Sequence, residues 1–281
     1  MPTSRPARHL LHMLLITLAL LPETLLANLF AGNSVDEDEL YRINPSTAQG
    51  VVVANYMDTF DLNSLAADPV RRVLYGMETD DNTLFTINSI SGEITPIGTH
   101  VYDSRREGLA FDANRNQLYM SGNMNEGELL RVDPATGQIS AIGSFGTDSG
   151  VMWGLAYDPA SDTIYGTDLE GGESFFYRIN PETGTAALVS VIGSTNEPRR
   201  LDGLTFDPAS NTLYAVDAAN DQLYIVDTTT GDLTTVGAPG LDDGYKALAF
   251  LDTTPARIPV NHPVALLMLC MLLGLLAYRR L

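Results

Sequence analysis

Short hydrophobic runs recur along the chain at a spacing of 44 to 49 residues. Each copy opens with leucine, a small residue, a variable residue and usually aspartate, and the copies begin at Leu65, Leu109, Leu155, Leu204 and, more loosely, Leu248. Three further runs follow in each of the first four copies: an aliphatic residue before tyrosine, a run ending in asparagine or aspartate, and a run ending in Ile-Gly or Val-Gly. Such short β-rich runs predict strands. Four antiparallel strands repeated every ~40–50 residues are typical of the blade of a β-propeller.

Turn residues separate the third and fourth runs of each copy. The clearest examples are residues 133–137 (DPATG), 180–184 (NPETG) and 227–231 (DTTTG). Asparagine or aspartate bonds to its own backbone, proline presets φ, and glycine adopts positive φ. These segments therefore predict tight hairpins.

The two ends of the repeat region share one further blade. Residues 28–32, 40–44 and 50–54 match the second, third and fourth runs of a copy, and Tyr245–Leu251 supplies the missing first run. A blade completed by both termini closes the ring and removes an exposed sheet edge. The sequence therefore predicts an all-β fold. It is a five-bladed β-propeller of four-stranded blades over residues 28–252, whose last blade has three N-terminal strands and one C-terminal strand.

The first 27 residues have the composition of a secretory signal peptide. Arg5 and Arg8 precede an apolar stretch at residues 10–21, and Ala27 is a small residue at a plausible cleavage position. The alternative is a short membrane anchor, but this 12-residue stretch falls below the ~20 residues needed to span a bilayer. We expect residues 1–27 to form a signal helix that is removed on export.

A second hydrophobic segment, residues 263–278, is followed directly by Arg279 and Arg280. Its uniformly apolar character disfavours the alternative of a buried core helix. It is long enough for a short transmembrane helix at ~1.5 Å per residue, and the arginines favour a cytoplasmic end. We expect residues 253–262 to be a linker and residues 263–281 a transmembrane or sorting tail. The rest of the chain would then lie on the periplasmic or cell-surface side.

Composition narrows the classes of function. The 281 residues are 44% hydrophobic with a formal net charge of −19, which indicates a folded chain and disfavours nucleic-acid binding. The single cysteine, Cys270, excludes internal disulfides and cysteine-based zinc sites. Residues 28–252 hold 11 basic and 34 acidic side chains, a net charge of −23, so their surface also repels anionic lipid.

Two parts of the chain resemble known families. The L-A-x-D-P and L-Y-x phrases of residues 28–252 are similar to those of NHL, YVTN and gluconolactonase-type propellers, which usually have six or seven blades. Residues 258–263 (IPVNHP), the hydrophobic segment and the final arginines resemble the PEP-CTERM and IPTL-CTERM sorting signals. The second resemblance implies an exported Gram-negative protein that is held at the inner membrane or cut by a sorting protease.

Six residues are candidates for a binding surface at one mouth of the central channel. The innermost strand of each blade lines the channel of a propeller, so the residues that enter these strands converge. They are Asn63, Glu107, Trp153, Asp202, Tyr245 and Lys246. The alternative is a rim of solvated side chains that binds nothing.

Calcium is the one cofactor that the family resemblance suggests. Gluconolactonase-type enzymes hold a divalent cation at the channel mouth, and the resemblance assigns this role to Asn63, Glu107 and Asp202, whose oxygen donors suit a hard cation. Catalytic groups are otherwise scarce, because residues 28–252 hold one histidine, His100, no cysteine and no G-x-S-x-G elbow. We therefore assign no catalytic residue.

Two repeated residue types are expected to be structural. The aspartate after the first run fits a side-chain-capped turn that closes a hairpin, and it occurs at Asp68, Asp112, Asp158 and Asp207. The tyrosine of the second run is expected to pack between blades, and it occurs at Tyr75, Tyr119, Tyr165 and Tyr214.

The combined expectation is an exported, membrane-tethered or sorted propeller that binds a protein or glycan of the cell envelope without catalysis. One alternative is a calcium-dependent, lactonase-like hydrolase with its site at the central channel. Another is a purely structural surface or matrix protein. The sequence leaves open the ligand, the oligomeric state and whether the tail is cleaved.

Overall fold

The repeated runs form five four-stranded antiparallel sheets in the part of the chain that the structure describes. The structure is a computed structural model. It describes residues 28–33, 38–56, 62–78, 82–99, 108–122, 127–147, 150, 152–171, 173–194, 197, 199–240 and 245–252, which belong to the unit Ala27–Asp252. The predicted signal helix, linker and tail (1–27, 253–262 and 263–281) lie outside these residues. Across the described ranges, no helix is long and apolar enough to cross a membrane.

Each sheet is one blade, whose strands follow one another from the inner edge to the outer edge. The first is β20 (Tyr245–Leu251), β1 (Asn28–Asn33), β2 (Glu39–Ile43) and β3 (Gly50–Asn55). The second is β4 (Leu62–Asp68), β5 (Val73–Glu78), β6 (Thr83–Asn88) and β7 (Ile94–Thr99). The third is β8 (Leu109–Asp112), β9 (Gln117–Gly122), β10 (Glu128–Val132) and β11 (Ile139–Ser144). The fourth is β12 (Gly154–Asp158), β13 (Thr163–Glu170), β14 (Glu173–Ile179) and β15 (Ala186–Ile192). The fifth is β16 (Leu201–Asp207), β17 (Thr212–Asp217), β18 (Gln222–Val226) and β19 (Leu233–Gly237).

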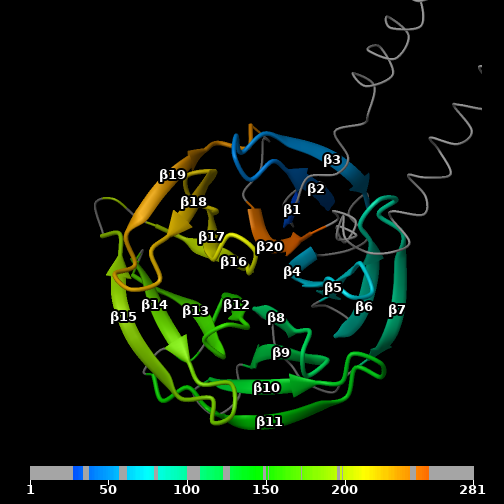
Figure 1. Ribbon diagram of the computed structural model, residues 1–281, viewed down its shortest axis with the longest axis horizontal. Coiled ribbons are helices and arrows are strands. Elements are labelled where there is room, and N and C mark those ends of the chain that lie inside the picture. Colours follow the sequence, from blue (N-terminus) through cyan, green and yellow to red (C-terminus); the bar gives the residue numbers. More distant parts are fainter. Residues whose placement is uncertain are drawn as a thin grey trace, which may run out of the picture. The chain divides into compact units, whose positions relative to one another are not determined.

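The five blades stand around a common centre, with β4, β8, β12, β16 and β20 innermost (Figure 1). The first blade joins the two ends of the unit, because β20 pairs antiparallel with β1 from Asn28 opposite Leu251 to Asn33 opposite Tyr245. This confirms the predicted number of blades and the predicted split blade. Because the ring is closed, every inner strand has a neighbouring inner strand on both sides.

The hydrophobic core consists of five clusters, each between two neighbouring blades. The cluster between the first and second blades, for example, contains Phe30, Leu40, Leu62 and Phe85. The other four clusters fill the remaining interfaces around the ring in the same way. Every interface lies within the unit 28–252, so we expect that unit to fold without the segments on either side.

The repeated tyrosine belongs to these interfaces. In four blades it contacts the aromatic side chain at the third position of the next blade's inner-strand phrase, with ring centroids 5.4–6.4 Å apart. The pairs are Tyr75 with Phe111, Tyr119 with Tyr157, Tyr165 with Phe206, and Tyr214 with Phe250. The predicted packing role is confirmed, and the pairing explains why both aromatic positions recur.

The repeated aspartate closes the hairpin between the first and second strands of its blade. Its Oδ1 accepts the N–H of the residue two positions later at 2.8–2.9 Å in each case. Its Oδ2 accepts from the side chain three positions later, arginine in two blades and serine in two. The four carboxylates are buried and bonded within their own turns (Asp68, Asp112, Asp158 and Asp207), so the predicted structural role is confirmed.

The glycine near the end of the fourth strand of a blade packs against a turn of the neighbouring blade, the turn that joins the third and fourth strands there. The glycine of an outer strand lies against the hairpin turn of the next blade, as Gly143 does against Thr183 and Gly184. Gly98 approaches Thr136 and Gly137 in the same way, and Gly237 approaches Ala48 at a longer distance. A side chain at these positions would separate the backbones, so glycine permits the close approach. We call these contacts the outer clasps.

Candidate functional site

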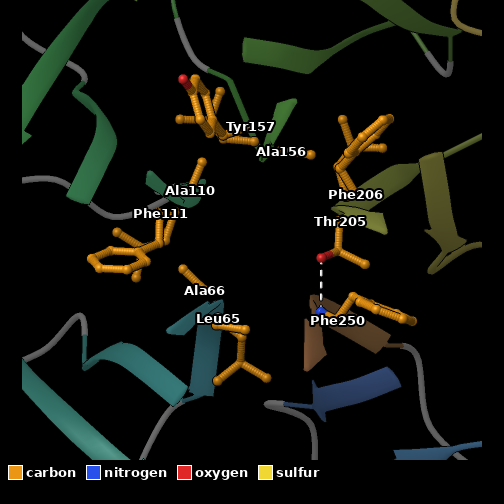
Figure 2. A pocket seen from close by; sticks show the side chains of 13 residues that line it. Leu65, Ala66, Ala110, Phe111, Ala156, Tyr157, Thr205, Phe206 and Phe250 are labelled. Carbon is orange, nitrogen blue, oxygen red and sulfur yellow. Dashed lines mark hydrogen bonds between the residues drawn. The ribbon is translucent and has the colours of Figure 1, made fainter. Parts of the chain in front are cut away.

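The central channel is narrow, and most of the residues that line it are of apolar type. Its wall consists of residues from the first three positions of the inner-strand phrases, among them Leu65, Ala66, Ala110, Ala156 and Phe206 (Figure 2). The cavity has a volume of about 50 Å³, whereas pockets for small-molecule ligands usually measure about 300–1,000 Å³. The channel therefore has room for a few water molecules, and a larger ligand has to bind outside it.

One hydrogen bond crosses the channel wall between two blades. The N–H of Phe250 on β20 donates to Oγ1 of Thr205 on β16 at 2.8 Å (Figure 2). Thr205 occupies the position at which the second, third and fourth blades carry alanine. Its hydroxyl therefore ties the split blade to its neighbour.

Replacing Thr205 by valine is expected to lower the free energy of unfolding by about 1–3 kcal/mol, because the buried Phe250 N–H loses its acceptor. Urea unfolding of residues 28–252 measures the loss. Thr205→Ser keeps the hydroxyl and is expected to lie closer to the wild type. A Thr205→Val midpoint at or above that of Thr205→Ser would contradict this role.

The predicted mouth residues lie where the inner strands begin. Asn63 and Asp202 are the second residues of β4 and β16, Lys246 is the second residue of β20, and Trp153 directly precedes β12. Because the blades share one architecture, these starts lie at the same end of the channel. Glu107 lies outside the described residues, so its predicted position is not tested.

Tyr245, the remaining predicted mouth residue, is fully buried. It belongs to the cluster between the first and fifth blades. Its ring packs edge-on against Tyr41, with centroids 5.7 Å apart and planes at 80°. The structure therefore gives Tyr245 a packing role in the interface.

Arg200, which was not among the predicted residues, contacts two of them, Trp153 and Asp202. Its guanidinium lies 5.1 Å from the centroid of the Trp153 ring. Its Nε donates to Oδ1 of Asp202 at 3.0 Å and lies 2.9 Å from Oδ2. Lys246 acts electrostatically on the same carboxylate. We call Trp153, Arg200, Asp202 and Lys246 the mouth cluster, and it spans the fourth, fifth and first blades.

The backbone of Arg200 is held as firmly as its side chain. Its N–H donates to Oδ1 of the buried Asp217 at 3.1 Å, and its carbonyl accepts the Ala218 N–H at 2.9 Å. The preceding Arg199 lies 3.5 Å from Asp217 Oδ2 and over the ring of Tyr224. The end of β17 thus positions both arginines at the mouth.

The opposite end of the ring is tied together by its own side chains. Arg115 donates to Asp162 and to the Tyr157 hydroxyl across the third and fourth blades at 2.7–2.9 Å. Arg71 donates to Asn116 in the same way across the second and third blades. Because Arg71 and Arg115 are both engaged with side chains of the neighbouring blades, we consider the mouth cluster the better candidate for a binding site.

Burial raises the pKa of Asp202 from 3.8 to about 6, although the nearby charges of Arg200 and Lys246 oppose the shift. The folded protein therefore takes up this proton more readily than the unfolded chain. The group contributes stability that is present at low pH and is lost as pH rises from about 4 to about 6. Asp202 thus lowers stability at neutral pH, which suggests that it serves the site.

Replacing Asp202 by asparagine is expected to raise the free energy of unfolding at pH 7.5 by up to about 3 kcal/mol, because the buried charge is removed while an oxygen remains to accept from Arg200. Urea unfolding at pH 7.5 and pH 4 measures the effect, and the gain over wild type should shrink at the lower pH. A loss of stability at pH 7.5 would contradict this interpretation.

The predicted calcium set can be compared only in part with the described residues. They contain no group of three or more histidine, cysteine, aspartate or glutamate side chains placed to hold a metal ion. Asn63 lies on the second blade, two blades from Asp202 on the fifth, and the carboxylate of Asp202 is already paired with a cation. With Glu107 outside the described residues, the calcium site stays a prediction.

Comparisons with known proteins agree on the fold and are silent on activity. The chain matches the model of a family described as a repeat of unknown function (DUF6923), over residues 39–198 and again over 109–250. No curated protein matches it.

Many solved structures are similar to the chain, and three of them illustrate the likeness. One is from a nidogen/laminin complex, with a TM-score of 0.56 and 13% identity over 80% of this chain and 98% of that one. Another is a structural genomics protein of unknown function from Bacteroides thetaiotaomicron, with a TM-score of 0.56 and 19% identity over 81% of this chain. TolB from Acinetobacter baumannii has a TM-score of 0.51 and 18% identity over 87% of this chain. The chain spans 62% of each of the last two. At these identities the likeness concerns the fold alone.

Proposed function

The chain belongs to the family of repeats of unknown function (DUF6923), and we propose that it is an exported propeller that binds a component of the cell envelope at its channel mouth without catalysing a reaction. The mouth cluster is the observation that carries this proposal. It brings an aromatic ring, a partly exposed arginine and a lysine to one end of a channel that is too narrow for a ligand. A rigid ring with a polar rim suits recognition.

The location of the protein is part of the proposal. The signal-like residues 1–27 and the tail 263–281 support export followed by retention in the inner membrane or release by a sorting protease. Fractionation of cells that produce the full chain tests this. Full-length protein in the membrane fraction, and a variant ending at residue 262 in the periplasm or medium, are the expected results. Cytoplasmic protein would contradict the proposal.

Binding at the mouth is tested by co-sedimentation of purified residues 28–252 with cell-envelope fragments. Arg200→Ala is expected to weaken binding at least about 10-fold, as the loss of charged hydrogen bonds typically does. Arg131→Ala is the matched control, because it removes the same charge from an exposed position on β10. Sedimentation that is absent in the wild type, or equal in folded Arg200→Ala, would contradict the proposal.

A lactonase-like hydrolase remains a second candidate because of one observation. A carboxylate with a pKa near 6 is a property that general bases share, and Asp202 has it at the channel mouth. The test is hydrolysis of a lactone panel with and without Ca²⁺. Activity that requires Ca²⁺ and is lost in Asp202→Asn would favour the hydrolase. Rates equal to the buffer blank would favour the binding module.

A further inference from the structure

The mouth cluster holds a preorganised donor group whose outer nitrogens are available. Arginine has five N–H donors in a rigid fork, and the Nε of Arg200 is bonded to Asp202. Within the described residues, neither η nitrogen of Arg200 donates a hydrogen bond, and the side chain is 36% exposed. A fork fixed at its base in this way loses little freedom when it binds, and its shape matches a carboxylate.

Three cations lie at this mouth although the protein is acidic, and two of them are paired with carboxylates, Arg199 with Asp217 and Arg200 with Asp202. Arg199, Arg200 and Lys246 lie at the starts of β16 and β20, whereas residues 28–252 carry a net charge of −23. Lys246 is also the only lysine of the chain. A polyanion would meet long-range repulsion from the rest of the surface. The local cations therefore favour a ligand with a single negative group on an otherwise neutral body.

The aromatic side chain beside the cations adds a flat apolar surface. Trp153 is half-buried at the same mouth and contacts Arg200. Aromatic rings provide large, rigid contact area, and the C–H face of a sugar ring packs well against them. A hexose that bears one carboxylate presents both features that the cluster would recognise.

We propose that the mouth cluster binds a sugar acid of an envelope glycan, with the carboxylate on the η nitrogens of Arg200, Lys246 as the second cation, and the sugar ring against Trp153. This inference rests on the proposed binding function and names its ligand class. A peptide that ends in a free carboxylate would satisfy Arg200 equally well but offers no ring for Trp153, so the geometry favours the sugar acid.

The fluorescence of Trp153 reports directly on this site, because it is the only tryptophan of the chain. Residues 28–252 are titrated with galacturonic acid, its methyl ester, galactose and acetyl-diglycine. We expect a saturable change with the acid that the ester and galactose do not give. The apparent affinity should fall at least about 10-fold in Arg200→Ala and less in Arg200→Lys, which keeps the charge and loses the fork. Arg131→Ala should titrate like the wild type.

Three results would overturn the inference: equal responses to acid, ester and galactose; a response to acetyl-diglycine alone; or no response to any probe. The envelope assay separates this failure from failure of the proposed function. If envelope binding depends on Arg200 while no sugar acid binds, only the ligand class is wrong. If envelope binding is also absent, the binding function itself is wrong.

Discussion

Ending the chain at Gly244, which removes β20, is expected to abolish the cooperative unfolding transition of the ring. β20 supplies the innermost strand of the first blade and contributes to the interfaces on both of its sides. Its large buried side chains are Tyr245, Leu248, Phe250 and Leu251, and each contributes about 1.5–3 kcal/mol. Their combined contribution is comparable with the whole stability of a typical domain, about 5–15 kcal/mol.

Thermal unfolding followed by circular dichroism measures this effect. A chain ending at Asp252 keeps β20 and is the matched control, which we expect to unfold in one transition. The chain ending at Gly244 should show no such transition and should expose hydrophobic surface to a dye. A shared, cooperative transition with similar midpoints would contradict the view that the split blade closes the ring.

Replacing Gly184 by alanine is expected to lower the free energy of unfolding by about 2–5 kcal/mol. Gly184 has a φ of +77°, a conformation that costs other residues about 1–2 kcal/mol. A Cβ at this position would also lie 2.3 Å from the carbonyl oxygen of Gly143 in the neighbouring blade. Forcing apart packed backbones costs about 1–3 kcal/mol more.

Gly171→Ala separates the two contributions. Gly171 has a similar φ of +61°, but a Cβ there would meet nothing within 4 Å, so we expect a loss of only about 1–2 kcal/mol. Chemical denaturation of both variants gives the difference. Equal losses would show that the outer clasp contributes nothing. Position 48 agrees with the clasp interpretation, since Ala48 is tolerated at a φ of +60°, and a Cβ added to its partner Gly237 would lie 3.4 Å from the Cβ of Ala48, an ordinary contact distance.

The periodic pattern of the chain was sufficient to predict the blades. Runs around Leu65, Leu109 and Leu155 repeat both polarity and turn chemistry, so strand order and the pairing of the two ends followed from local signals. The reason for the Ile-Gly phrase did not follow. Position 143 needs glycine because the backbone of the next blade passes close to it. These two segments are far apart in the sequence, so the sequence pattern does not reveal the contact.

The candidate site was predictable only in part, for a related reason. Trp153, Asp202 and Lys246 follow from their positions at strand starts. Arg200 precedes its strand and enters the cluster because Asp217 turns its backbone toward the mouth. A usable signal was the Arg199–Arg200 pair in a segment of net charge −23. Tyr245 holds an equivalent place in the sequence, but the split blade buries it against Tyr41.

Hydrogen exchange of residues 28–252 with and without cell-envelope fragments tests most directly whether the channel mouth is the binding surface. We predict slower exchange in segments 152–158, 199–206 and 245–250, the same slowing in Arg131→Ala, and none of it in Arg200→Ala. Slower exchange confined to the turns at 69–72 and 113–116, at the opposite end of the inner strands, would contradict a binding surface at the mouth.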